Sequence, residues 1–87
     1  MNQKNLKLKD YYSTADLAMA TAISLWYPLE ALDRTQNPHK AYFLFKRDEQ
    51  LDKLIESYWR GELKVNPQTY FAALKNIKAR LYEERRV

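Results

Sequence analysis

The side chains with the clearest potential for chemistry gather towards the C-terminus. Lysine and arginine neutralise phosphates, and aromatic rings stack on unpaired bases. At about 100° per residue, one side of a predicted C-terminal helix carries Lys75, Lys78, Tyr82, Arg85 and Arg86. Phe71 borders this side, and an N-terminal group of lysines would add phosphate contacts, namely Lys4, Lys7 and Lys9. The pattern predicts a nucleic-acid-binding surface. An ordinary solvated face is the alternative, because a basic last turn also complements the helix dipole.

The distribution of charge follows the same pattern. The formal net charge is +4, and the positive excess lies in residues 1–12 and 75–87. An anionic partner suits such a chain, although a modest net charge also serves plain solubility.

A second group of side chains predicts contacts with protein. Domains of this length bury little more than half of the surface of the unfolded chain, so 87 residues cannot hide every aromatic ring. The candidates for an exposed apolar patch are Tyr11, Tyr12, Trp26, Tyr27 and Trp59, which cannot all be fully buried. Aromatic residues are frequent interface anchors. They would suit a homodimer, an accessory subunit of a larger complex, or an inhibitor of a host or defence enzyme. Alternatively, they compensate for small size and the absence of disulfides.

Residues for catalysis are sparse. The single histidine, His39, lies in a predicted turn, and capping explains Ser13 as a helix N-cap and Asp16 as the acid three residues later. We interpret the acids in the middle of the chain as residues of a first helical turn and as solvent-facing ion-pair partners of Lys53 and Arg60. These acids are Asp48, Glu49, Asp52 and Glu56. One glycine cannot build a phosphate-cradling loop. We therefore expect a non-catalytic binding protein with no metal site, no cofactor and no small-molecule substrate.

The chain also predicts where the protein works. It contains no cysteine, so disulfides and thiolate metal sites are excluded. No signal peptide follows Met1, and no apolar run approaches the roughly 18 residues of a membrane span. A cytoplasmic location without a membrane partner is expected.

The elements that position these side chains predict a single α+β domain. Residues 1–12 form a basic tail or a short edge strand, and the domain covers residues 13–87. Ser13 caps a first helix, whose apolar stripe comprises Ala15, Ala18, Met19, Ala22, Ile23 and Trp26 and which ends before Pro28. Residues 29–46 form a β-hairpin, in which Ala41, Phe43 and Phe45 share the face towards the helices.

Two further helices complete the predicted order of helix, β-hairpin, helix, helix. Asp48 caps the second helix, which buries a stripe and ends at Gly61. Asn66 and Pro67 start the third helix. The second stripe is Leu51, Leu54, Ile55 and Tyr58, and the third is Tyr70, Leu74, Ile77 and Leu81.

Several segments together resemble a family of small uncharacterised proteins of bacteria, archaea and their phages and plasmids. The run Tyr12-Ser13-Thr14-Ala15-Asp16-Leu17-Ala18-Met19-Ala20 is similar to the opening Y-S-T-x-D-L-A-L-A of that family. Phe43-Leu44-Phe45 is similar to its F-x-F strand. Tyr58-Trp59-Arg60-Gly61-Glu62-Leu63-Lys64-Val65 resembles Y-W-x-G-x-x-x-V, and Lys78-Ala79-Arg80-Leu81-Tyr82 resembles K-x-x-L-Y. The resemblance implies the fold and a phage or mobile-element setting, and it assigns no activity.

Overall fold

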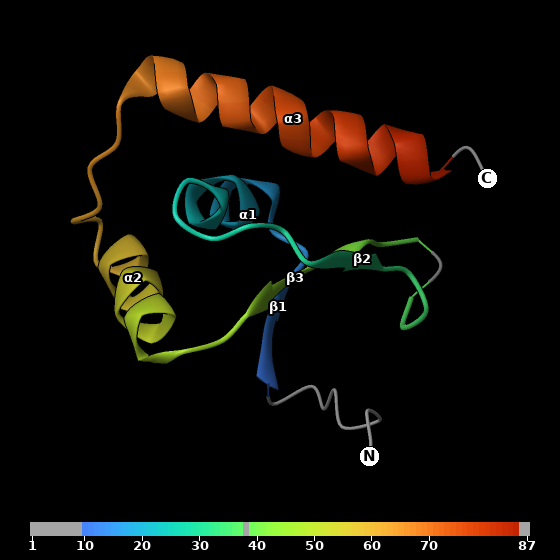
Figure 1. The fold of residues 1–87 in the computed structure, drawn as a ribbon, viewed down its shortest axis with the longest axis horizontal. Helices are drawn as coiled ribbons and strands as arrows, with labels where there is room; N and C mark the ends of the chain where they lie inside the picture. The colour runs from blue at the N-terminus through green and yellow to red at the C-terminus, as the bar shows by residue number, and fades with distance from the viewer. Residues whose placement is uncertain (1–9, 38, 86–87) are drawn as a thin grey trace.

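A three-stranded antiparallel sheet and three helices make up the computed structural model, which describes residues 10–37 and 39–85, the last two by their backbone only (Figure 1). In chain order the elements are β1 (Tyr11–Thr14), α1 (Leu17–Ser24), β2 (Ala31–Asp33), β3 (Tyr42–Lys46), α2 (Glu49–Trp59) and α3 (Pro67–Arg85). The predicted α+β class is confirmed, and so is the order of helix, hairpin, helix and helix. The strand β1 precedes them.

The sheet has the order β1-β3-β2, so the aromatic strand β3 lies in its middle. β2 and β3 form the predicted hairpin, with Asp33 opposite Tyr42. Phe43 and Phe45 are both buried, as expected for the face towards the helices. Tyr12 lies opposite Phe45 on this face and packs against the core, because directly paired residues of antiparallel strands point to the same side.

The predicted start of the first helix is wrong by about one turn. Ser13 lies in β1 opposite Leu44 and caps nothing. Asp16 is the N-cap instead, and its Oδ1 accepts hydrogen bonds from the backbone N–H groups of Ala18 and Met19, at 2.9 and 3.3 Å. Pairing with β3 keeps the backbone at Ser13 extended, and the sequence offers a second good cap three residues later.

Burial of α1 also differs from the predicted stripe. The consecutive residues 19–23 are all buried, whereas Ala15, Ala18 and Trp26 are exposed. Figure 1 shows the cause, since α1 lies between the sheet and α3. Thr21 can be fully buried because its hydroxyl donates to the carbonyl of Leu17, at 2.8 Å. A helix enclosed in this way has no single apolar stripe.

The ends of the other two helices are as predicted. Asp48 caps α2 by accepting from the backbone N–H of Leu51, at 2.8 Å. Gly61 follows the helix with a φ of 72°, the left-handed conformation that ends many helices. The side chain of Asn66 accepts from the N–H of Thr69, and Pro67 is the first residue of α3.

The core lies where α1 meets the sheet, α2 and α3. Its buried members are Met19, Ala20, Ile23, Phe43, Phe45, Leu51 and Ile77. The partly buried Leu54, Ile55, Tyr58 and Leu81 pack against them, in agreement with the predicted stripes of α2 and α3. None of the helices within residues 10–37 and 39–85 has the length and apolar character needed to cross a membrane.

Candidate functional site

The predicted basic face occupies the exposed side of α3. Phe71, Lys75, Lys78 and Tyr82 all lie on α3 and are all exposed, and we call them the basic stripe. They recur at intervals of four, three and four residues, which keeps them within about 60° of one another around the helix axis. The backbone of Arg85 continues this row. Lys4, Lys7, Lys9 and Arg86 lie outside the described residues.

The two rings of the basic stripe do not close the core. Phe71 is 56% exposed and Tyr82 is 55% exposed, whereas Ile77, on another side of the same helix, is buried. The ammonium of Lys75 lies 5.0 Å from the centroid of the Phe71 ring, within the range of a cation–π contact. The stripe therefore presents aromatic surface and positive charge together.

The aromatic residues named as candidates for a protein interface lie in different parts of the structure. Tyr12 and Tyr27 pack against the core, and Tyr11 is half-buried on the edge strand. Trp26 and Trp59 are 52% and 66% exposed. The structure gives them separate surroundings.

Trp26 borders a hollow of about 360 Å³, the Trp26 groove, between the end of α1 and one side of α2. Its other lining residues are Tyr27, Gln50, Lys53, Leu54 and Ser57. Trp59 packs edge-on against Tyr58, with ring centroids 5.4 Å apart. It is two residues beyond Ser57 in α2, about 200° around the helix axis, so it faces away from the groove.

One hydrogen bond fixes the segment beside the Trp26 groove. The hydroxyl of Tyr27 donates to Oδ1 of Asp48, at 2.7 Å. This bond is the main reason that the pKa of Tyr27 is raised to about 12 and the pKa of Asp48 is lowered. Asp48 also caps α2, so its carboxylate joins the residues after α1 to the start of α2.

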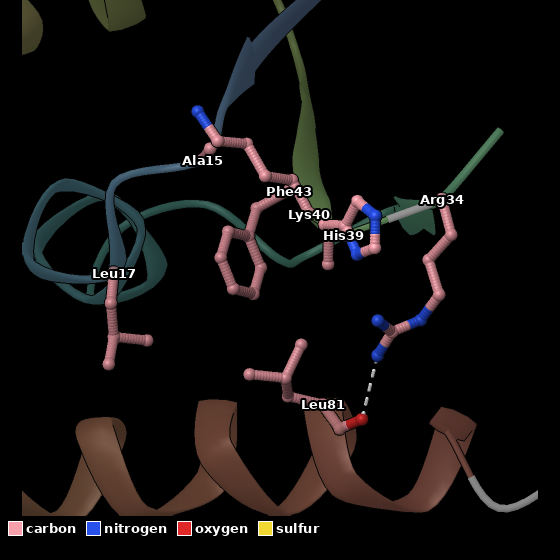
Figure 2. A pocket seen from close by; sticks show the side chains of 8 residues that line it. Ala15, Leu17, Arg34, His39, Lys40, Phe43 and Leu81 are labelled. Atoms are coloured by element: carbon pink, nitrogen blue, oxygen red, sulfur yellow. Dashed lines mark hydrogen bonds between the residues drawn. The ribbon is translucent and has the colours of Figure 1, made fainter. Parts of the chain in front are cut away.

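A second hollow, of about 520 Å³, was not foreseen from the sequence (Figure 2). We call it the hairpin pocket. Its apolar wall comes from Ala15, Leu17, Ala41, Phe43 and Leu81, and its basic lining residues are Arg34, His39 and Lys40. The signal in the sequence that points to this pocket is the predicted hairpin, because a hairpin brings the residues after β2 close to those before β3.

Arg34 is held rigidly beside this pocket. Its Nη2 donates to the carbonyl of Leu81, at 2.9 Å, and this bond joins the hairpin to α3. Its Nε is buried and has no hydrogen-bond partner among the described residues. A buried donor without a partner is uncommon in proteins.

The residues considered for catalysis make the hydrogen bonds and ion pairs of turns and helix surfaces. His39 is exposed, and its backbone N–H donates to the side chain of Asn37. Glu56 pairs with Arg60, at 2.8 Å, as the predicted partnership of these acids with Arg60 requires, and Asp52 pairs with Arg47, at 3.0 Å. Across the described part of the chain, no three His, Asp or Glu side chains are grouped to hold a metal ion.

Comparison with known families shows which family the chain resembles. A family described as a domain of unknown function, DUF5659, matches residues 9–83. This confirms the expectation of an uncharacterised domain family. No curated protein and no solved structure matches the chain.

Proposed function

The chain belongs to the DUF5659 family of domains of unknown function, and we propose that it is a small non-catalytic protein that binds single-stranded nucleic acid through the basic stripe of α3. The observation that carries the proposal is the exposure of Phe71 and Tyr82 beside Lys75 and Lys78. An apolar ring that is half in water stabilises the fold little, but it offers a platform for an unpaired base.

The dimensions of the stripe support this proposal. The stripe extends from Phe71 to Tyr82 over about 16 Å, at about 1.5 Å per residue. Lys75 and Lys78 lie between the two rings along the helix. Bases stacked on the rings would thus leave their phosphates near the ammonium groups, which is the usual combination in proteins that bind single strands without sequence preference.

The rest of the proposal concerns the setting of the protein. The motif resemblance supports a phage or mobile-element origin, and the absence of cysteine supports a cytoplasmic location. The roles found for Asp16 and Asp48, which both cap helices, support a protein without catalytic chemistry.

A titration with a fluorescent single-stranded oligonucleotide of about 12 nucleotides tests the proposal. The double variant K75Q/K78Q should weaken binding and lower the slope of log K against log salt by about one for each lysine removed. The double variant F71A/Y82A should weaken binding by about 1–3 kcal/mol for each base that loses its ring, with the salt slope unchanged.

Two matched controls accompany this titration. Trp26→Ala removes an exposed ring outside the stripe, and Lys46→Gln removes an exposed lysine on β3. Trp26→Ala should leave the affinity unchanged, and Lys46→Gln should change it less than K75Q/K78Q does. Equal losses in the control and stripe variants, or an affinity indifferent to F71A/Y82A, would sink the proposal.

A protein–protein module is the second candidate, and the Trp26 groove favours it. Trp26 is more than half exposed next to a hollow that also contains Leu54, and a large ring of a partner would fit such a surface. This function predicts a dimer or complex that persists at high salt and that the variant Trp26→Ala fails to form. It also predicts that the oligonucleotide does not bind.

A further inference from the structure

We propose that the hairpin pocket binds a small organic anion, one that combines a carboxylate or phosphate group with an apolar body. The sequence gave no reason to expect a small-molecule ligand. The lining residue Leu81 lies on α3, the helix that also carries the basic stripe, but the proposal does not depend on nucleic-acid binding.

The size and wall of the pocket suit a molecule rather than a simple ion. Its volume of about 520 Å³ falls within the range of about 300–1,000 Å³ that is typical of ligand sites. Leu17 comes from α1, Phe43 from β3 and Leu81 from α3, so three elements form the apolar wall. Packing of these elements therefore shapes the pocket before any ligand arrives.

The charge of the pocket selects the sign of the ligand. Figure 2 shows the Arg34 guanidinium and the His39 ring at one end of the pocket, and Lys40 is also a lining residue. None of its described lining residues is acidic. An anion would therefore meet the Arg34 guanidinium, which the Leu81 carbonyl holds in place, and the exposed Lys40, without competition from a carboxylate in the lining.

The nearest acid in the sequence has other partners. Asp33 precedes Arg34, but Oδ1 accepts from the N–H and hydroxyl of Thr35, at 2.8 and 2.6 Å, and Oδ2 accepts from the side chain of Gln36, at 2.7 Å. These bonds lower the pKa of Asp33. Its carboxylate thus serves the turn after β2 rather than the guanidinium of Arg34.

Arg34 is prepared to receive an anion. A guanidinium has five N–H donors in a planar fork that matches a carboxylate or phosphate. One donor is used on the Leu81 carbonyl, which fixes the group, and Nε is itself buried, so an anion in the pocket would bind the remaining N–H donors of the two terminal nitrogens. A side chain already held by the fold loses little conformational entropy when a ligand binds.

These features together require a ligand of two parts. The apolar wall gains from a hydrocarbon body, which inorganic phosphate lacks, and the cations gain from a charge, which a neutral apolar molecule lacks. Phenyl phosphate and benzoate share this chemistry and differ in their anionic group.

Titration of the isotope-labelled protein by NMR tests the proposal with four probes: phenyl phosphate, benzoate, inorganic phosphate and benzyl alcohol. We expect saturable chemical-shift changes of the Ala41, Phe43 and Leu81 amides with phenyl phosphate or benzoate. Whichever of these two probes binds more tightly identifies the preferred anionic group. Inorganic phosphate and benzyl alcohol should each bind at least about tenfold more weakly. The proposal is overturned if inorganic phosphate or benzyl alcohol binds as tightly as the better of the two two-part probes. It is also overturned if neither phenyl phosphate nor benzoate gives a saturable shift.

Variants then locate the site. Arg34→Met should lower the affinity for the tighter-binding probe by about tenfold or more. Lys40→Gln, at an exposed position, should lower the same affinity by about threefold. Lys46→Gln is the matched control, because Lys46 lies on β3 but is absent from the pocket lining. If Arg34→Met does not fold, the test is the comparison of probe affinity in Lys40→Gln with that in Lys46→Gln. Equal losses of affinity in these two variants overturn the site.

The double variant K75Q/K78Q separates this proposal from the proposed function. It should keep the affinity for the tighter probe within about twofold, because exposed charges interact weakly, while it weakens the oligonucleotide. Loss of probe binding in K75Q/K78Q would place the anion on the basic stripe and overturn the pocket.

Discussion

Asp48 shows how much a single side chain can do in a domain of this size. One oxygen of its carboxylate accepts both the capping N–H of Leu51 and the hydroxyl of Tyr27. The first bond starts α2, and the second holds the segment that follows α1. Both bonds stabilise the charged carboxylate, which is why its pKa is lowered.

This residue predicts a loss of stability in acid. A carboxylate whose pKa is lower in the folded protein adds stability above the unfolded value of about 3.9, and that stability disappears as the pH falls through the folded value. Asp48→Asn keeps a capping side chain but cannot titrate. Urea unfolding between about pH 5 and pH 2 should therefore show a smaller loss of free energy in Asp48→Asn than in the wild type.

Tyr27→Phe serves as the companion variant in that experiment. It removes the largest cause of the lowered pKa of Asp48 and leaves the cap, so the acid-dependent loss should be intermediate. The explanation fails if Asp48→Asn loses as much stability in acid as the wild type.

Local signals at single residues were predictable wherever no distant contact competed with them. Asp48 and Asn66 cap the helices they were expected to cap. Ser13 does not, because its place in the sheet depends on Leu44, which is far away in the sequence. Two neighbouring capping residues, Ser13 and Asp16, are equivalent by propensity, and only the strand pairing decides between them.

At the scale of elements, the patterns of β3 and α2 gave the correct faces, but the pattern of α1 did not. Phe43 and Phe45 alternate with half-buried residues because one side of the sheet faces the helices. In α1 the buried run from Met19 to Ile23 carries no helical periodicity. Small residues such as Ala20 and Ala22 allow close packing on several sides, and neighbours on several sides cannot be read from one segment.

The junction of α2 and α3 carries the prediction that belongs to this scale. Gly61 has a φ of 72°, and an added Cβ would meet no atom within 4 Å. Gly61→Ala should therefore destabilise the protein through backbone strain alone, by about 1 kcal/mol. Urea unfolding measures this loss.

Two further substitutions calibrate it. Gly61→Asn should cost less than Gly61→Ala, because asparagine tolerates the left-handed conformation better. Glu62→Ala, at the exposed neighbour, should stay within about 0.5 kcal/mol of the wild type. A neutral Gly61→Ala would show that the turn can adopt another backbone conformation.

For the molecule as a whole, the sequence located the basic stripe but not the two hollows. Phe71 to Tyr82 form one helix, so their common side follows from periodicity alone. Arg34 and Leu81 come together only because the hairpin packs next to α3, and Trp26 and Lys53 line one groove only because α2 packs beside the end of α1. Surfaces made by several elements require the tertiary structure.

The strand order β1-β3-β2 has a consequence for the route by which the chain folds. Asp33 meets Tyr42 across a short loop, whereas Thr14 meets Phe43 only after all of α1 and β2 have been spanned. Closing a longer loop costs more entropy, so the hairpin should form in the folding transition state and β1 should dock late. In stopped-flow kinetics, Leu32→Ala in β2 should mainly slow refolding, and Tyr12→Leu in β1 should mainly accelerate unfolding. The reverse assignment would mean that the N-terminal strand, despite its distance along the chain, belongs to the folding nucleus.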